Sequence, residues 1–264
     1  MSWIDDQKHL KEVQYRTPQR LNARFELHRR FSQQTEDFLS WTGRMLPITA
    51  GQRLLDVGCG PARLWQTLTD LPEAVRVVLA DFSAGMMRTA RHALHADGRF
   101  GFAQADVQAL PMQAALFDGV VANHMLYHVP DIDHAVRELA RVLRPGGWLC
   151  TACNGVGHVQ EIYQLAGRFT HKSMAADPGL RYSLENGADF LAECFTDIRV
   201  LRHAGDLWVT EAQPLVDYIL TIWSQDDGEP GWVEQLLAEI EGQIARSGGV
   251  RITRSTGLIL ARRR

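Results

Sequence analysis

The sequence predicts an α/β fold in which helices cover a mostly parallel sheet, and two patterns favour that architecture. Between Arg53 and Ala152, short apolar runs alternate with helical patterns, which is typical of successive βαβ units. The apolar runs suit strands that are buried on both faces. The chain has 264 residues, 45% of them hydrophobic, and is long enough to form one large domain. We expect strands at 53–57, 76–80, 100–104, 118–123 and 147–153.

Helices are expected between these strands. One covers residues 62–69, and another begins after Ser83, whose hydroxyl suits an N-cap, and continues through His95. The clearest covers residues 132–143, where apolar positions repeat along one helical stripe. Proline and two glycines at 145–147 then end it.

Further elements are expected on both sides of this central region. Residues 19–46 predict one or two helices, and residues 157–183 predict a helical insertion. The last two strands are expected to pair antiparallel at one edge of the sheet. The C-terminal elements should be a helix at 184–194, a strand at 197–202, helices at 214–223 and 232–246, and a strand at 250–260. The candidate core positions of these flanking helices are Leu21, Phe25, Phe31, Phe38, Met45, Val233, Leu236, Leu237, Ile240 and Ile244.

Charge and hydropathy exclude several classes of partner. The formal charge of −3 and the pI near 6.4 argue against nucleic acid, whose binding surfaces are normally basic. No apolar stretch reaches membrane-spanning length and the N-terminus has no signal pattern, so we expect a cytoplasmic protein without a membrane anchor. The basic run Arg262–Arg264 is expected to be a frayed, solvated end.

Cys150 and Cys153 stand at the spacing that redox and metal sites use. They fall in the expected strand 147–153, where an offset of three residues puts side chains on opposite faces. A redox pair normally opens a helix, and none is expected there. We therefore expect two separate structural thiols.

Gly58 and Gly60 follow directly after the first expected strand. Glycines at that position let a ligand lie against bare backbone. Asp81 comes 21 residues after Gly60 and closes the next strand, where a carboxylate is placed to bind the paired hydroxyls of a ribose. Together these residues predict a pocket for a cofactor that carries a nucleoside.

Five segments in this order resemble the class I S-adenosylmethionine-dependent methyltransferases, in particular the small-molecule branch related to quinone-biosynthesis methyltransferases. The resemblance is close over residues 50–153 and holds in outline elsewhere. Each motif alone is weak, and their shared order and spacing are specific. The segments are Leu54–Pro61, Leu79–Met87, Gln104–Met112, Phe117–Val129 and Arg141–Gly147.

The resemblance implies a doubly wound, seven-stranded Rossmann-like sheet with strand order 3-2-1-4-5-7-6 and a helical insertion after strand five. It implies a single methyltransferase domain over residues 1–264. Within it, residues 1–49 would form a helical lid and residues 50–153 the cofactor-binding core. Residues 154–264 would supply the helices of the substrate wall and the C-terminal strands.

The resemblance also implies that the cofactor is S-adenosylmethionine and assigns its contacts. Gly58 and Gly60 would approach the methionine part, with Asp56 polarising their loop. Asp81 would bind the ribose, and Asn123 would lie near the sulfonium. A strand-end aspartate is often only a helix cap, but Asp81 and Asp106 both end strands where open α/β sheets bind ligands.

The remaining cofactor contacts implied by the resemblance come from two regions. Phe82 and Met86 would flank the adenine, while Asp106 and Val107 would meet its amino edge. From the N-terminal lid, Tyr15 and Arg24 are the candidates to hold the cofactor carboxylate or the acceptor. The remaining arginines of that helix are expected on a solvated face.

The residues after the fourth strand narrow the acceptor to a small molecule. The chain has Asn123-His124-Met125-Leu126 where base-modifying amino-methyltransferases carry Asn-Pro-Pro-Tyr or Asp-Pro-Pro-Tyr, and no cysteine follows a proline. We therefore expect methyl transfer to an oxygen or nitrogen of a metabolite. His124 and Tyr127 are the candidate catalytic residues, and a packing role is the alternative for both. For His128, packing is the favoured role. No third ligand accompanies the two histidines at metal-site spacing.

Two other functions remain open at this point. A nicotinamide oxidoreductase would use a similar glycine loop, but Arg63 stands where the dinucleotide fingerprint needs glycine or alanine. A non-catalytic protein that binds S-adenosylmethionine would have side chains filling the space between Tyr15, Asn123 and Tyr127. The oligomeric state is left open.

Overall fold

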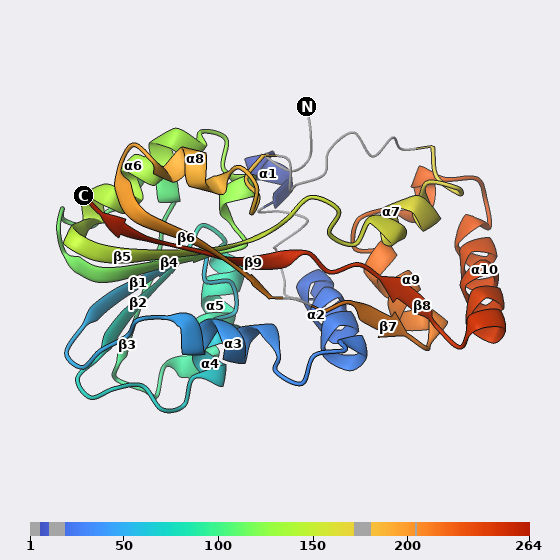
Figure 1. Cartoon of the computed structure of the whole chain (residues 1–264), viewed down its shortest axis with the longest axis horizontal. Coiled ribbons are helices and arrows are strands. Elements are labelled where there is room, and N and C mark those ends of the chain that lie inside the picture. The colour runs from blue at the N-terminus through green and yellow to red at the C-terminus, as the bar shows by residue number, and fades with distance from the viewer. Residues whose placement is uncertain (1–5, 11–18, 172–180, 204) are drawn as a thin grey trace.

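The computed structural model describes residues 6–10, 19–171, 181–203 and 205–264. Two parts lie next to each other in Figure 1. One is a seven-stranded sheet with helices on both faces. The other, beyond one end of that sheet, contains helices and a two-stranded sheet. None of the helices in the described ranges is long and apolar enough to cross a lipid bilayer.

The large sheet has the order β3-β2-β1-β4-β5-β9-β6, which confirms the expected order 3-2-1-4-5-7-6. The first five strands of the chain pair in parallel. β9 runs antiparallel between β5 and β6, so the expected antiparallel pair at one edge is confirmed. The strands are β1 (Arg53–Val57), β2 (Arg76–Asp81), β3 (Phe100–Gln104), β4 (Phe117–Asn123), β5 (Leu143–Asn154), β6 (Phe195–His203) and β9 (Thr256–Arg263).

Helices cover both faces of this sheet. One face packs against α3 (Phe38–Met45), α4 (Arg63–Thr67) and α5 (Ala84–Leu94), and the other against α6 (Ile132–Val142) and α8 (Gly187–Leu191). Asp37 caps α3, Ser83 caps α5 as expected, and Asp131 caps α6.

The two cysteines of β5 confirm the expected alternation of its side chains. Cys150 packs in the core beneath α4 and α5, whereas Cys153 packs in the core beneath α6. Burial raises the pKa of both thiols, to about 12 for Cys153, and neither is in a disulfide. They are structural residues of the sheet.

A second apolar core lies in the other part of the molecule. Leu27 and Phe31 of α2 pack there with helices from the C-terminal half, so the N-terminal helix is built into this core. Of the core positions expected in residues 19–46, Phe31 is buried and the other four are half-buried. The elements of this core are α2 (Gln19–Phe31), α7 (Gln160–Ala166), α9 (Ala212–Ile219), α10 (Trp232–Ser247), β7 (Leu207–Val209) and β8 (Val250–Ile252).

The expected strand at 250–260 is wrong in its bounds, because two different sheets share that segment. β8 pairs with β7, and only from Thr256 does the chain enter the large sheet. Between them, the Thr253 carbonyl accepts from the N–H of Val159 and the Ser255 carbonyl from that of Gly155. The backbone at 253–255 is thus hydrogen-bonded to the β5–α7 loop, and this interrupts the expected strand.

The C-terminal arginines are also not a frayed end. Arg262 and Arg263 belong to β9, which is hydrogen-bonded on both sides. The three guanidinium groups donate to the carbonyls of Gly146, Leu143 and Ala192. The run therefore fastens the last strand to its neighbours.

Candidate active site

The glycine loop after β1 is built by two left-handed residues. Gly58 and Gly60 have φ of +68° and +54°, a region that glycine adopts without strain. A Cβ on Gly58 would lie 2.7 Å from Cβ of Met125, whereas the nearest described atom to a Cβ on Gly60 would be Leu21 Cδ2 of α2, at 4.0 Å. Gly58 thus makes room for the loop after β4, and Gly60 presents bare backbone toward α2.

Asp81 joins this loop to the start of α5. Its Oδ2 accepts the N–H of Gly60 at 2.9 Å and its Oδ1 accepts the N–H of Ser83 at 2.8 Å. The residue is 5% exposed, and burial raises the pKa of its carboxyl to about 6. Each carboxylate oxygen keeps a second lone pair for a ligand hydroxyl.

Asp56 has one satisfied and one unsatisfied oxygen. Its Oδ2 accepts the indole N–H of Trp65 at 2.7 Å, while its buried Oδ1 has no partner among the described residues. Burial raises the pKa of this carboxyl to about 7, and the nearby charge of Asp81 adds to the shift. A buried acceptor without a donor is costly, so this oxygen is suited to a cationic or N–H ligand group.

The carboxyl end of β4 carries a second unsatisfied acceptor. Oδ1 of Asn123 is buried without a partner in the described part of the chain. His124 follows with φ of +53°, its N–H held by the Ala152 carbonyl at 2.8 Å. Its ring lies 5.4 Å from that of Phe38, and burial lowers the pKa of the imidazole to about 4.

The residues expected near an adenine lie around the ends of β2 and β3. Met86 is buried and Phe82 half-buried. Asp106 caps a 3-10 turn, with Oδ1 accepting the N–H of Gln108 at 2.9 Å, and Val107 is buried in the core below.

Of the three remaining candidates, the structure describes Tyr127 and Arg24. Tyr127 is buried in the core beneath α6, with its ring 4.5 Å from that of His128. Arg24 donates from Nε to Thr221 Oγ1 at 2.7 Å, so its guanidinium lies against the end of α9. Tyr15 lies outside the described residues.

Two further histidines, outside the residues expected from the sequence, pack against each other; His158 is buried and His28 is half-buried. The rings of His28 in α2 and His158 after β5 are stacked, with centroids 5.8 Å apart and an interplanar angle of 10°. Tyr218 of α9 meets the His28 ring edge-on at 6.1 Å. No local pattern predicts this group, because its members are 130 residues apart and only the fold brings them together.

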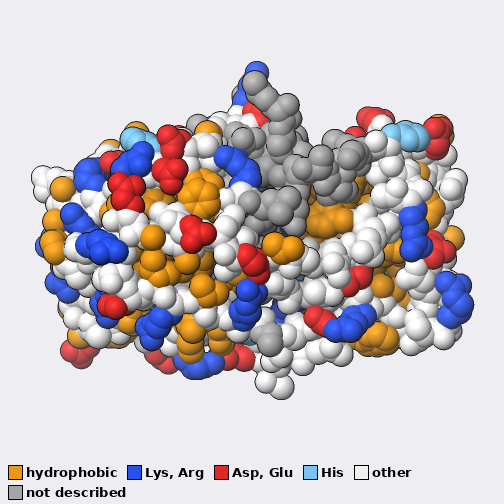
Figure 2. Space-filling view, turned by 45° about the horizontal axis from the view of Figure 1, so that its top comes forward, with side chains coloured by type: hydrophobic (Ala, Val, Ile, Leu, Met, Phe, Trp, Pro, Cys, Tyr) orange, Lys and Arg blue, Asp and Glu red, His pale blue; other side chains and the backbone are white. Residues whose placement is uncertain are grey.

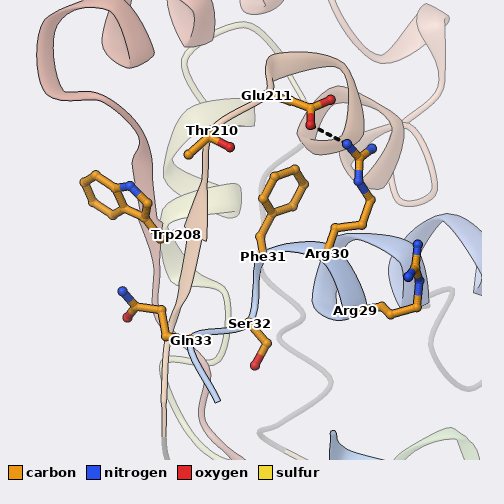
Figure 3. Close-up of a pocket in the computed structure, with 8 residues that line it drawn as sticks. All are labelled: Arg29, Arg30, Phe31, Ser32, Gln33, Trp208, Thr210 and Glu211. Atoms are coloured by element: carbon orange, nitrogen blue, oxygen red, sulfur yellow. Dashed lines mark hydrogen bonds and ion pairs between the residues drawn. The ribbon is translucent and has the colours of Figure 1, made fainter. Parts of the chain in front are cut away.

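A surface depression of about 700 Å³ lies elsewhere, between the end of α2 and β7 (Figure 3). Arg30 and Glu211 form an ion pair on its rim, and Trp208 and Phe31 contribute apolar surface. None of the expected site residues that fall within the described ranges lines it. Among the described residues, no group of three histidine, cysteine, aspartate or glutamate side chains is arranged to hold a metal ion.

A family model described as a methyltransferase domain matches residues 55–151. Residues 55–151 are thus similar to this methyltransferase domain. The glycine loop, Asp56, Asp81 and Asn123 all lie inside the matched region. His28 and His158 lie outside it.

Curated relatives are similar over about two fifths of the chain. The 27-O-demethylrifamycin SV methyltransferase of Amycolatopsis mediterranei is 40% identical over 108 residues, which is 40% of this chain and 39% of the relative. The ubiquinone biosynthesis O-methyltransferase of Albidiferax ferrireducens is 37% identical over 114 residues, 42% of this chain and 44% of that one. The chain thus spans about two fifths of the length of these relatives.

Solved structures share the fold over the whole chain. Phosphoethanolamine N-methyltransferase 2 of Haemonchus contortus, in complex with S-adenosyl-L-methionine, superposes with a TM-score of 0.60 at 19% identity. The match covers 100% of this chain and 60% of that one. The expected Rossmann-like fold of the sheet is therefore confirmed.

Proposed function

We propose that this protein is an S-adenosylmethionine-dependent methyltransferase that acts on an oxygen or nitrogen of a small molecule. The observation that carries the proposal is the pair of buried carboxylates at the glycine loop. Asp56 has an acceptor without a donor, and Asp81 retains lone pairs beside the Gly60 backbone. The methyltransferase family of residues 55–151 and the relatives that carry methyltransferase names support it.

These residues fit the methyl donor. The ammonium of its methionine part is a suitable partner for Asp56 Oδ1, and its ribose hydroxyls for Asp81. When bound, S-adenosylmethionine supplies a methyl group on a sulfonium, which is already an excellent leaving group. The protein's contribution is therefore to align the acceptor and, where needed, take its proton.

The remaining assignments belong to the same proposal. Residues 50–153 bind the donor, while residues 1–49 and 154–264 enclose the acceptor within one domain. Gly58, Gly60 and Asn123 serve the methionine end, and Tyr15 and Arg24 serve its carboxylate or the acceptor. His124 and Tyr127 are the catalytic candidates from the sequence. The adenine contacts are Phe82, Met86, Asp106 and Val107.

The acceptor is proposed to be a small molecule rather than nucleic acid or a membrane. The formal charge is −3, and acidic and basic side chains are interspersed on the face shown in Figure 2. On that face the described residues form no continuous basic stripe of the kind that tracks a phosphate backbone. Four cysteines outside disulfides suit the proposed location in the cytoplasm.

Calorimetry on the purified protein tests the donor site. We expect S-adenosylmethionine to bind and NAD not to bind, and Asp81→Ala to weaken binding at least about tenfold because the ribose contact and the Gly60 contact are both lost. Asp70→Ala, at an exposed aspartate, is the matched control and should bind as the wild type does. Tight NAD binding, or unchanged affinity in a folded Asp81→Ala protein, would contradict the proposal.

A further inference from the structure

Two buried carboxyl groups lie on neighbouring strands next to the glycine loop. Asp56 of β1 is 3% exposed, and Asp81, at the end of β2, is also buried. β1 and β2 pair directly, so the sheet holds the two groups in place. Ionisation of Asp56 is opposed by the charge of Asp81. The fold therefore keeps two like charges together away from water.

Asp56 is the less well compensated of the two groups. Asp81 accepts a backbone N–H on each oxygen, whereas only Oδ2 of Asp56 has a donor, the indole N–H of Trp65. Oδ1 of Asp56 is buried with no partner in the described part of the chain. Burial raises the pKa of this carboxyl to about 7, although the Trp65 N–H opposes the shift. A buried, uncompensated carboxylate is costly, and its protonated form is much less so.

The groups that face Asp56 supply no positive charge. They are the indole of Trp65 on α4, the carboxyl of Asp81, and the thiols of Cys59 in the glycine loop and Cys150 on β5. Burial raises the pKa of both thiols, so they are neutral near pH 7. Among the described residues, no arginine, lysine or histidine acts on either carboxyl. This part of the chain thus leaves the site without a cation, which a ligand can supply.

We propose that binding of the methyl donor is coupled to the loss of a proton from Asp56, so that the site is a pH-sensitive switch. This inference rests on the proposed methyltransferase function. The carboxyl O–H bond of Asp56 breaks, its electron pair stays on the oxygen, and the proton leaves to water or buffer. Oδ1 then accepts a hydrogen bond from the donor's ammonium, which keeps its own protons. One positive charge replaces another, and donor affinity falls as the pH falls below 7.

Trp65 is the positioning residue of this exchange. Its indole N–H occupies Oδ2 of Asp56 at 2.7 Å and leaves Oδ1 to carry either the proton or the ligand contact. The indole is buried, and its ring lies edge-on to that of Phe100, with centroids 6.1 Å apart. Trp65→Phe should keep this packing but remove the N–H. Because that N–H stabilises the charged carboxylate, Asp56 should then lose its proton only at a higher pH.

Calorimetry at pH 6, in two buffers of different ionisation enthalpy, measures the protons released when S-adenosylmethionine binds. An α-amino group is almost fully protonated at that pH, so the ligand contributes few protons. We expect the wild type to release about one proton more than Asp56→Asn. Its affinity should rise roughly fivefold from pH 6 to pH 7, and that of Asp56→Asn less than about twofold, which Asp81 alone can supply. Asp70→Asn, at an exposed aspartate, is the control and should match the wild type.

Carbon-13 NMR on protein with labelled aspartate carboxyls follows Asp56 itself. Its signal is assigned by its loss in Asp56→Asn. Without ligand we expect it to titrate near pH 7. With bound S-adenosylhomocysteine, which has the ammonium but no methyl group to transfer, it should be ionised at pH 6. Trp65→Phe should move the ligand-free midpoint upward, and Trp208→Phe, at an exposed tryptophan of β7, should leave it unchanged.

The two proposals fail in different ways. A protein that does not bind S-adenosylmethionine contradicts the proposed function. A protein that binds it but releases no more protons than Asp56→Asn, or whose Asp56 is already ionised at pH 6 without ligand, contradicts this inference alone. If Asp56→Asn does not fold or binds too weakly, the wild-type release at pH 6 decides. About one proton or more supports the inference, and about half a proton, as Asp81 alone would give, overturns it.

Discussion

The backbone N–H of Gly60 donates to Oδ2 of Asp81 across 2.9 Å and joins the loop after β1 to the end of β2. The second oxygen of the same carboxylate holds the first turn of α5 through Ser83. The loop is thus shaped by the protein itself. A ligand would not have to order it, so little binding energy is spent on that step.

Gly60→Ala should abolish binding of S-adenosylmethionine. The alanine would be strained at φ +54°, at a cost of about 1–2 kcal/mol, and its methyl group would occupy the space between the loop and Leu21. Gly51→Ala is the matched control, because its φ is +74° and no atom of the described residues lies within 4 Å of its Cβ position. Calorimetry and melting curves should show similar destabilisation in both variants and lost affinity only in Gly60→Ala. Equal affinities would remove Gly60 from the site.

Asp56→Asn should stabilise the ligand-free protein more at pH 8 than at pH 4. Burial raises the pKa of Asp56 to about 7 from 3.8, so ionising it costs folding free energy that is absent below pH 3.8 and complete above pH 7. At about 1.4 kcal/mol per pKa unit, the variant's gain in free energy of unfolding should be larger at pH 8 than at pH 4 by up to about 4 kcal/mol. Denaturant titrations at the two pH values measure it, and donor binding should weaken. A gain independent of pH would mean that this carboxylate is not buried in charged form.

The parallel half of the fold could be predicted because its signals are local. Short apolar strands, the Ser83 cap and the glycine loop each act over a few residues, and their order implies the sheet. The alternation that separates Cys150 from Cys153 is equally local. The break at Thr253–Ser255 could not be predicted, since the partners of that backbone lie in the loop after β5.

Two pairs of residues show the same difference. Gly60 and Asp81 lie at the ends of neighbouring strands, where topology alone brings them together. His28 and His158 approach each other only because α2 packs into the second core. Even beside the predicted glycine loop, one contact could not be predicted. Met125 packs against Gly58, and no sequence pattern indicates that contact.

Arg63→Ala should weaken the packing of α2 against the start of α4, which follows the glycine loop. Arg63 begins α4, donates from Nη2 to Asn22 Oδ1 at 2.5 Å and lies 4.3 Å from the centre of the Phe25 ring. Losing the hydrogen bond and the cation–π contact should cost about 1–2 kcal/mol. Hydrogen exchange should speed up in α2 and leave β4 unaffected. Arg88→Ala, at an exposed arginine of α5, is the control; unchanged exchange in α2 would show that the second core alone holds this helix.

His28→Phe should make the protein more resistant to acid. Burial, and the positive charges of Arg254, His124 and Arg24, lower the pKa of His28 to about 3. The unfolded chain takes up this proton below about pH 6.5 and the folded protein does not, so stability is present above pH 6.5 and is lost as the pH falls toward 3.

Between pH 7 and pH 5 this histidine should account for about 2 kcal/mol of that loss. Phenylalanine preserves the contacts with the His158 and Tyr218 rings but has no proton to gain. Urea titrations at pH 7 and pH 5 should therefore show a smaller loss of stability in His28→Phe than in the wild type. His92→Phe, at an exposed histidine of α5, is the control and should behave like the wild type. An identical loss in all three proteins would mean that His28 is already protonated at pH 5 in the folded state.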